Sequence, residues 1–200
     1  MNFHRTNNVI SLANNYDIIK NKTAIRVISI FLLVLFMILG AYVSIRIYLS
    51  PIPITFQTMF VLIGAILLGK KLSTISQALY LGLGAIGLPV FSSFGAGILW
   101  FAGLTGGYLI GFILASFIIG ILKTDKVFHS TINLIVLLLV GEIIIFTCGP
   151  LHLTIFYKYT LKNAFLIGVF PFIPGEIIKL CIAVGLINAL KNSHFIRQLK

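Results

Sequence analysis

The stretch from Pro171 to Leu190, PFIPGEIIKLCIAVGLINAL, is long and apolar enough to cross a membrane, yet it carries two charged residues. A helix needs about 20 mostly apolar residues to span the hydrocarbon of a bilayer. Glu176 and Lys179 are spaced so that both lie on one face of such a helix. Charged residues inside a membrane helix are costly, and they usually face a bundle interior, a partner or a ligand. This pair is therefore the first candidate for a functional site.

The composition of the whole chain is that of a membrane protein with several spans. Hydrophobic residues fill 59% of the 200 positions and the mean hydropathy is +1.10, whereas a soluble domain has roughly 45–50% apolar residues. We expect an all-α integral membrane protein, with a bundle of six transmembrane helices over residues 25–190. Residues 1–24 would form a cytoplasmic N-terminal segment and residues 191–200 a cytoplasmic tail. The predicted spans are Ile25–Ile45, Phe56–Gly69, Leu72–Leu88, Leu104–Leu122, Thr131–Cys148 and Pro174–Leu190.

The distribution of basic residues predicts how the bundle is oriented. The net charge is +11, and the cytoplasmic loops of membrane proteins collect Lys and Arg, so the charge needs no nucleic-acid partner. With six spans and an inner N-terminus, 11 of the 15 basic residues fall on the inner side. The predicted outer side holds Arg46, Lys158 and Lys162. We therefore expect both termini in the cytoplasm and the chain in the cell (inner) membrane.

The sequence lacks the residue patterns of ATP-dependent and metal-dependent enzymes. The stretch GAILLGKK (Gly64–Lys71) approaches the phosphate-binding pattern G-x-x-x-x-G-K-[ST], but Lys71 replaces the hydroxyl that binds magnesium. Cys148 and Cys181 lie at or within apolar runs, as buried thiols commonly do. His152 is predicted in a loop, and the four histidines show no metal-ligand spacing: His4, His129, His152 and His194. We predict no catalytic residues, no metal site, no cofactor and no enzyme activity.

Polar residues within the spans also have structural explanations. Glu176 falls in the first turn of its helix, where the helix dipole favours an anion, and Lys179 can extend its stem to the headgroups. Glu142 lies midway along the fifth predicted span, without a cation nearby in sequence. It would either form a hydrogen bond across helices or couple to a proton or to Lys179. A stripe of small residues in the fourth span predicts close helix packing: Gly103, Gly107, Gly111 and Ala115.

Four motifs follow one another along the chain between Pro51 and Ala183. They are P-I-T-x-Q-T, G-L-P-V-F, T-G-G-Y-L-x-G-F and P-F-x-P-G-[DE]-x-x-K. Each is weak alone, but together and in this order they resemble the BioY family of biotin transporters. The resemblance implies the substrate-capture (S) component of an energy-coupling-factor (ECF) importer, with a biotin pocket near the outer face of six helices. It also implies partners: a separate transmembrane coupling protein and two ATPase subunits.

The resemblance also assigns candidate binding residues. Glu176 and Lys179 match the acidic residue and the lysine of the last motif, and Gln57 matches the glutamine at the start of the second span. The ureido ring of biotin offers N–H donors and a carbonyl acceptor, to which a carboxylate and an ammonium can form charge-assisted hydrogen bonds. Many members have Asp where this chain has Glu176. The biotin carboxylate is left to Arg46, a backbone amide or water, and the favoured role for Arg46 is anchoring to the headgroups. Candidates for the apolar walls are Phe91, Tyr108 and Tyr80.

Two other functions remain open from the sequence. One is capture of another small vitamin through the same fold. The other is a structural or assembly role in the membrane, in which the Glu176–Lys179 pair only fixes helix packing. The family resemblance also implies docking of a coupling protein on small residues of the first span, which in this chain are Gly40, Ala41 and Ser44 and do not form a clean Ala-x-x-x-Ala stripe.

Overall fold

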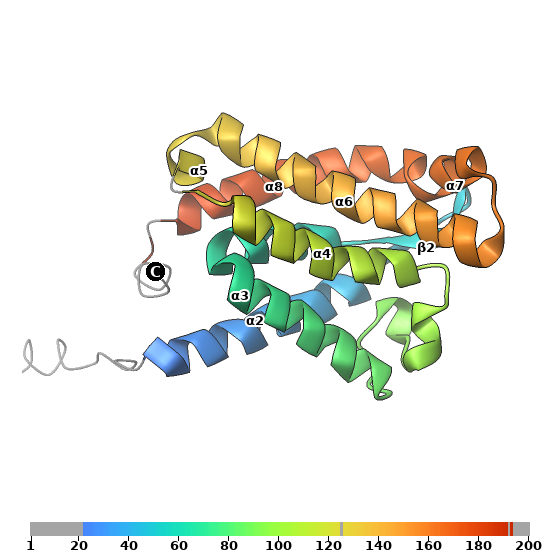
Figure 1. The fold of residues 1–200 in the computed structure, drawn as a ribbon, viewed down its shortest axis with the longest axis horizontal. Helices are drawn as coiled ribbons and strands as arrows, with labels where there is room; N and C mark the ends of the chain where they lie inside the picture. Colours follow the sequence, from blue (N-terminus) through green and yellow to red (C-terminus); the bar gives the residue numbers. More distant parts are fainter. Residues whose placement is uncertain (1–21, 125, 192, 194–200) are drawn as a thin grey trace, which may run out of the picture.

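The helices expected from the apolar runs are present in the computed structural model, which describes residues 22–124, 126–191 and 193 (Figure 1). The expected N-terminal segment and tail lie mostly outside these residues. Four described segments are long and apolar enough to cross a membrane: α2, α3, α6 and the continuous stretch from α7 to α8. The longer helices are α2 (Lys22–Tyr42), α3 (Gln57–Ala85), α4 (Gly106–Leu122), α6 (Thr131–Tyr157) and α8 (Ile173–Leu190). The shorter elements are α5 (Lys126–His129), α7 (Leu161–Gly168), η1 (Ser92–Phe94), η2 (Ile98–Phe101) and η3 (Phe170–Phe172).

Helix α3 consists of two arms that meet at Gly69. This residue has φ 74° and ψ 179°, a backbone conformation that glycine adopts readily because it has no Cβ. The second arm turns back from the first (Figure 1). With the arms counted separately the bundle has six helices, as predicted, and the break falls at the predicted boundary. The residues Gly64–Leu67 are buried helix, so the stretch that approaches a phosphate-binding pattern does not form a phosphate-binding loop.

The segment around Pro51 and Pro53, which the sequence predicts as a loop, is a β-hairpin. Strand β1 (Ser44–Ile47) pairs antiparallel with β2 (Ser50–Thr55), and Ser44 lies opposite Thr55. Proline fits here because each strand of a two-stranded hairpin has a free edge where a missing N–H costs no ladder hydrogen bond. The first helix accordingly ends at Tyr42 rather than at Ile45. Strand β2 ends at Thr55 and α3 begins at Gln57. This short connection holds the residues at the β2–α3 junction in place.

Helix α6 is longer than the predicted fifth span, and it continues past Cys148 to Tyr157. Pro150 removes one helical hydrogen bond, but the helix continues because α4 and α7 pack against it. His152 is therefore helical and buried, and its predicted position in a loop is wrong. Its Nε2 atom lies 3.1 Å from the Gly103 carbonyl oxygen.

Small residues bring α4 close to α6, as the stripe in the sequence predicts. Gly107 faces the turn of α6 that contains Cys148 and His152, and Gly111 faces Ile145. Gly103 belongs to the same predicted stripe but precedes the helix, which begins at Gly106.

Replacing Gly107 by alanine should lower the stability of the bundle by about 1–3 kcal/mol, because a Cβ here would overlap the backbone of α6. Gly82 is the matched control, since a Cβ there would meet nothing within 4 Å. We expect Gly82→Ala to unfold at or slightly above the temperature of the parent protein, because alanine favours a helix over glycine, and Gly107→Ala to unfold at a lower one. Equal thermal midpoints for the two variants would contradict the close approach of α4 and α6.

The two ends of the bundle carry different elements. Figure 1 shows the start of α2, the break in α3, α5 and the end of α8 at the left end, and α7 at the right end. Described basic residues from the predicted inner side belong to the left-end elements: Lys22, Arg26, Lys70, Lys71 and Lys191. Lys162 lies in α7, at the opposite end. These described basic residues of the predicted inner side therefore lie at the end of the bundle opposite to Lys162.

Candidate functional site

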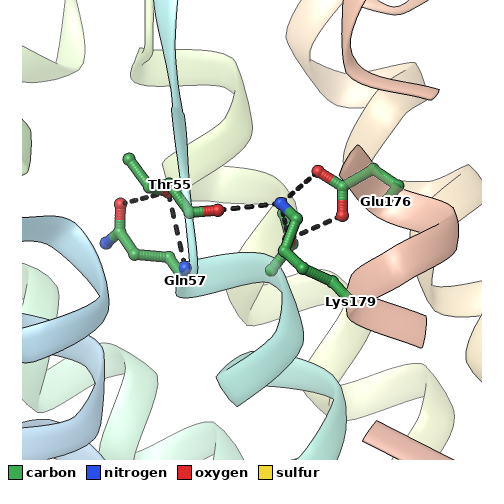
Figure 2. A network of polar contacts seen from close by, with 5 residues as sticks. Thr55, Gln57, Glu176 and Lys179 are labelled. Carbon is green, nitrogen blue, oxygen red and sulfur yellow. Dashed lines mark hydrogen bonds and ion pairs between the residues drawn. The ribbon is translucent and has the colours of Figure 1, made fainter. Parts of the chain in front are cut away.

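Polar side chains from the β2–α3 junction and from α8 form one buried network (Figure 2). The Lys179 Nζ atom donates hydrogen bonds to the Thr55 carbonyl oxygen at 2.8 Å, to the Thr58 hydroxyl at 3.0 Å and to the Glu176 carboxylate. The Thr58 hydroxyl donates in turn to the other Glu176 oxygen at 2.8 Å. Since an ammonium has three donors, Lys179 is fully bonded. The network therefore ties α8 to the start of α3.

The network bears on one of the structural explanations that the sequence left open for the pair, the extension of Lys179 to the headgroups. Lys179 is 3% exposed and Glu176 is 7% exposed, so the Lys179 side chain points inward and does not extend to the headgroups. Glu176 does lie in the first turn of α8, as predicted. Its carboxylate, however, bonds to Thr58 and Lys179, so its role extends beyond favouring the start of the helix.

A second chain of hydrogen bonds starts from the same junction. The Gln57 Nε2 atom donates to the Tyr80 hydroxyl at 2.6 Å, and this hydroxyl donates to the Val90 carbonyl oxygen at 3.0 Å. The Thr55 hydroxyl donates to Gln57 Oε1 at 3.2 Å. Tyr80 is fully buried behind Gln57, so it acts on the site by fixing the Gln57 amide.

A cavity lies beside this network, and its polar lining includes Thr55, Gln57, Thr58 and Glu176. The volume of this cavity is about 40 Å³, well below the roughly 300–1,000 Å³ of typical ligand pockets, so its side chains would have to move apart to admit a ligand. Much of the remaining wall is aromatic: Phe91, Trp100, Tyr108, Phe112, Phe146 and Phe172. A small number of polar groups on an apolar wall is the usual make-up of a small-molecule site.

The aromatic wall is held in place by its own contacts. The Tyr108 hydroxyl donates to the Gly168 carbonyl oxygen at 2.6 Å, which leaves the ring to serve as the wall. The Phe91 ring meets the Tyr80 ring edge-on, with centroids 5.6 Å apart, and stacks with Trp100 at 6.3 Å. These contacts limit the freedom of the side chains that would hold a ligand.

The structure brings the six predicted site residues together in two layers. Glu176, Gln57, Tyr108 and Phe91 border the cavity. Lys179 stands behind Glu176, and Tyr80 stands behind Gln57. The sequence reasoning did not select Thr58, although it is the second threonine of the quoted P-I-T-x-Q-T motif. It also missed Trp100, Phe112, Phe146 and Phe172. Phe112 and Phe172 are positions of the quoted motifs T-G-G-Y-L-x-G-F and P-F-x-P-G-[DE]-x-x-K, and Trp100 is the single tryptophan of the sequence, whereas Phe146 has no such signal.

A second hollow adjoins the cavity and contains Arg46. The two spaces share the lining residues Pro53, Ser92, Trp100 and Thr105. The Arg46 Nη2 atom donates to the Ser93 hydroxyl at 3.1 Å. Arg46 is thus a cation in the lining of the hollow that adjoins the cavity.

The chemistry of the site is that of recognition by hydrogen bonds. A carboxylate with free lone pairs can accept from the N–H groups of a flat molecule that packs between the aromatic rings. Among residues 22–124, 126–191 and 193, no three His, Cys, Asp or Glu side chains cluster in a way that could hold a metal ion.

Known proteins share both the sequence and the fold of this chain. The model of the BioY family matches residues 13–194. The biotin transporter BioY of Thermotoga maritima is 40% identical over 155 residues, which cover 78% of this chain and 89% of that protein. The biotin transporter BioY of Lactococcus lactis subsp. cremoris is 35% identical over 168 residues, covering 82% and 88%.

A solved structure resembles the chain over nearly its whole length. The crystal structure of the S-component for biotin from an ECF-type ABC transporter matches with a TM-score of 0.82 and 30% sequence identity, covering 91% of this chain and 99% of that one. The family match, the relatives and the solved structure together show that the chain belongs to the BioY family.

Proposed function

We propose that this chain captures biotin in the cavity beside Glu176 and mediates its uptake through the cell membrane. Its relatives are biotin transporters, and the solved structure that it resembles is a biotin S-component. The chain is accordingly a multi-pass membrane protein of biotin uptake. The observation that carries the site is a buried carboxylate, held by Lys179 and Thr58, that borders an aromatic cavity.

The Glu176 carboxylate would accept the ureido N–H groups. Each of its oxygens accepts one hydrogen bond, from Lys179 or from Thr58, and a carboxylate has about four lone-pair positions. Lone pairs therefore remain for the ring N–H groups of biotin. Lys179 holds the carboxylate, and it would reach the ureido carbonyl only by giving up its bond to Thr55 or Thr58.

The other residues that line the cavity match the bicyclic ring and the valeryl chain of biotin in their chemistry. The rings of Phe91 and Tyr108 would pack on the bicyclic ring, and Gln57, fixed by Tyr80, would supply an amide at the wall. The valeryl chain would run toward the adjoining hollow, where Arg46 can meet its carboxylate. A pair that served only to pack helices would need no such cavity, which favours ligand capture over a purely structural role.

Transport would be driven by other subunits of an ECF-type importer. We propose one transmembrane coupling protein and two ATPase subunits as the partners, with this chain acting as a binding protein and not as an enzyme. The buried helical conformation of Gly64–Leu67 supports this division, because it leaves the one stretch that approaches a phosphate-binding pattern unable to bind a nucleotide.

The purified protein should bind biotin and should not bind ATP. Calorimetric titration of each ligand in detergent measures this directly, and pantothenate and thiamine serve as matched controls for other vitamins. We expect a saturable signal with biotin alone. Binding of either control vitamin in place of biotin, or saturable binding of ATP, would overturn the proposal.

Both termini should face the cytoplasm. The test replaces Cys148 and Cys181 with serine and then introduces one cysteine at Lys162 or at Lys71, both of which are exposed positions at opposite ends of the bundle. A membrane-impermeant thiol reagent added to intact cells should label position 162 and spare position 71. The reverse labelling pattern would show that the bundle is inverted.

A further inference from the structure

The carboxyl group of Glu142 is buried, and no donor among the described residues reaches either of its oxygens. Glu142 lies midway along α6 and is 7% exposed. Burying an unpaired carboxylate in hydrocarbon is costly, whereas a neutral carboxylic acid is far cheaper to bury. The proposed biotin site does not account for a buried carboxyl group at this position.

Glu142 and Glu176 face the same groove between α6 and α8. Apart from these two acids the groove is lined by apolar side chains, among them Ile143 of α6 and Ile177 of α8. Glu176 and Phe146 border both the groove and the biotin cavity. Glu142 thus stands behind Glu176, on the side away from the cavity, within range of the charges of Glu176 and Lys179.

The ionisable groups that meet here do not balance if all of them are charged. Helix α8 contributes Glu176 and Lys179, and α6 contributes Glu142. At the neighbouring Gly141 the helix packs against apolar side chains, Ile119 of α4 and Leu62 of α3. Two acids and one base are neutral together only when one acid keeps its proton. Glu176 accepts bonds from Lys179 and Thr58, as a carboxylate does, which leaves the proton to Glu142.

We propose that Glu142 is a neutral carboxylic acid that positions Glu176 by donating its O–H to the Glu176 carboxylate. The Glu176 oxygens have lone pairs left after bonding to Lys179 and Thr58, so one can accept from Glu142 while others face the cavity. Glu142 would then be a positioning residue that touches no ligand. The effect of Glu142 on biotin binding rests on the proposed function, whereas the protonation of Glu142 does not depend on it.

Infrared spectroscopy tests the protonation without any ligand. The chain has only 4 acidic residues, so a D17N/D125N background leaves Glu142 and Glu176 as the only side-chain carboxyls. At pH 7 we expect the carbonyl stretch of a protonated carboxylic acid in this background, and its loss in the E142Q variant. The absence of this band in the background protein, or its persistence after E142Q, would overturn the proposal.

Biotin titration tests the positioning role. Glu142→Gln keeps a neutral donor and should weaken biotin binding by no more than about threefold. Glu142→Leu removes the donor and should weaken it by about tenfold or more, which corresponds to ~1.4 kcal/mol. Thermal unfolding of the Leu variant checks that the bundle remains folded. Equal binding by the two variants, whether strong or weak, would contradict the positioning role. If the parent protein bound no biotin, the proposed function would be wrong. The infrared experiment would still test the protonation of Glu142, because it uses no ligand.

Discussion

Replacement of Glu176 by glutamine should weaken biotin binding by about 10- to 100-fold, or ~1.4–2.8 kcal/mol. Glutamine preserves the shape of the side chain but puts an amide in place of the charged acceptor, and one charge-assisted hydrogen bond is worth roughly 1.5–3 kcal/mol. The substitution also leaves the buried Lys179 ammonium without its counter-charge, which adds a penalty. Calorimetric titration of biotin into the parent and the variant measures the difference.

Glu176→Asp is the matched control for this experiment. Aspartate keeps the charged acceptor and shortens the side chain by one methylene, so its effect should be much smaller than that of glutamine. A ranking in which Asp binds biotin as weakly as Gln would indicate that the position of the carboxylate matters more than its charge. Parent-like binding by the Gln variant would remove Glu176 from the binding site.

Lys179→Met should reduce biotin binding by at least about tenfold while the bundle remains folded. Lys179 connects α8 to the Thr55 carbonyl and the Thr58 hydroxyl, and methionine retains only the apolar stem. The Glu176 carboxylate would then be buried without a cation, and breaking a buried pair on one side costs roughly 3–5 kcal/mol. The measurements are the biotin affinity, the helical content by circular dichroism and the thermal midpoint.

A double variant separates binding from stability. Glu176→Gln combined with Lys179→Met removes both charges, so it should recover part of the thermal stability that Lys179→Met loses. Its biotin affinity should stay low, because the acceptor is gone. If Lys179→Met bound biotin like the parent protein, the network around Lys179 would have no part in presenting Glu176 to the ligand.

The six helices and the pair on α8 could be predicted because both depend on local sequence. The length of an apolar run determines whether it can span a bilayer, and the spacing of Glu176 and Lys179 places them on one helix face. The β-hairpin could not be predicted in this way. Its strands are short, and Pro51 and Pro53 are typical of loops unless each strand has a free edge.

The network at the site could be predicted only in part, because its partners are distant in sequence. Thr58 lies 118 residues from Glu176, and Thr55 lies 124 residues from Lys179. Local spacing cannot show that α8 packs on the β2–α3 junction, so the sequence predicted Lys179 as a ligand contact and did not show that all three of its donors are used. For the same reason it could not distinguish a Tyr80 that holds Gln57 from a Tyr80 at the cavity wall.

The most direct test of this account is the position of the ureido ring in an experimental structure of the protein with bound biotin. The distances from the two ring nitrogens to the Glu176 carboxylate oxygens are the quantity to measure. We expect at least one of them to fall at about 2.7–3.2 Å, with the bicyclic ring between Phe91 and Tyr108. A ureido ring with neither nitrogen within about 3.5 Å of Glu176 would contradict the assignment of this carboxylate as the biotin acceptor.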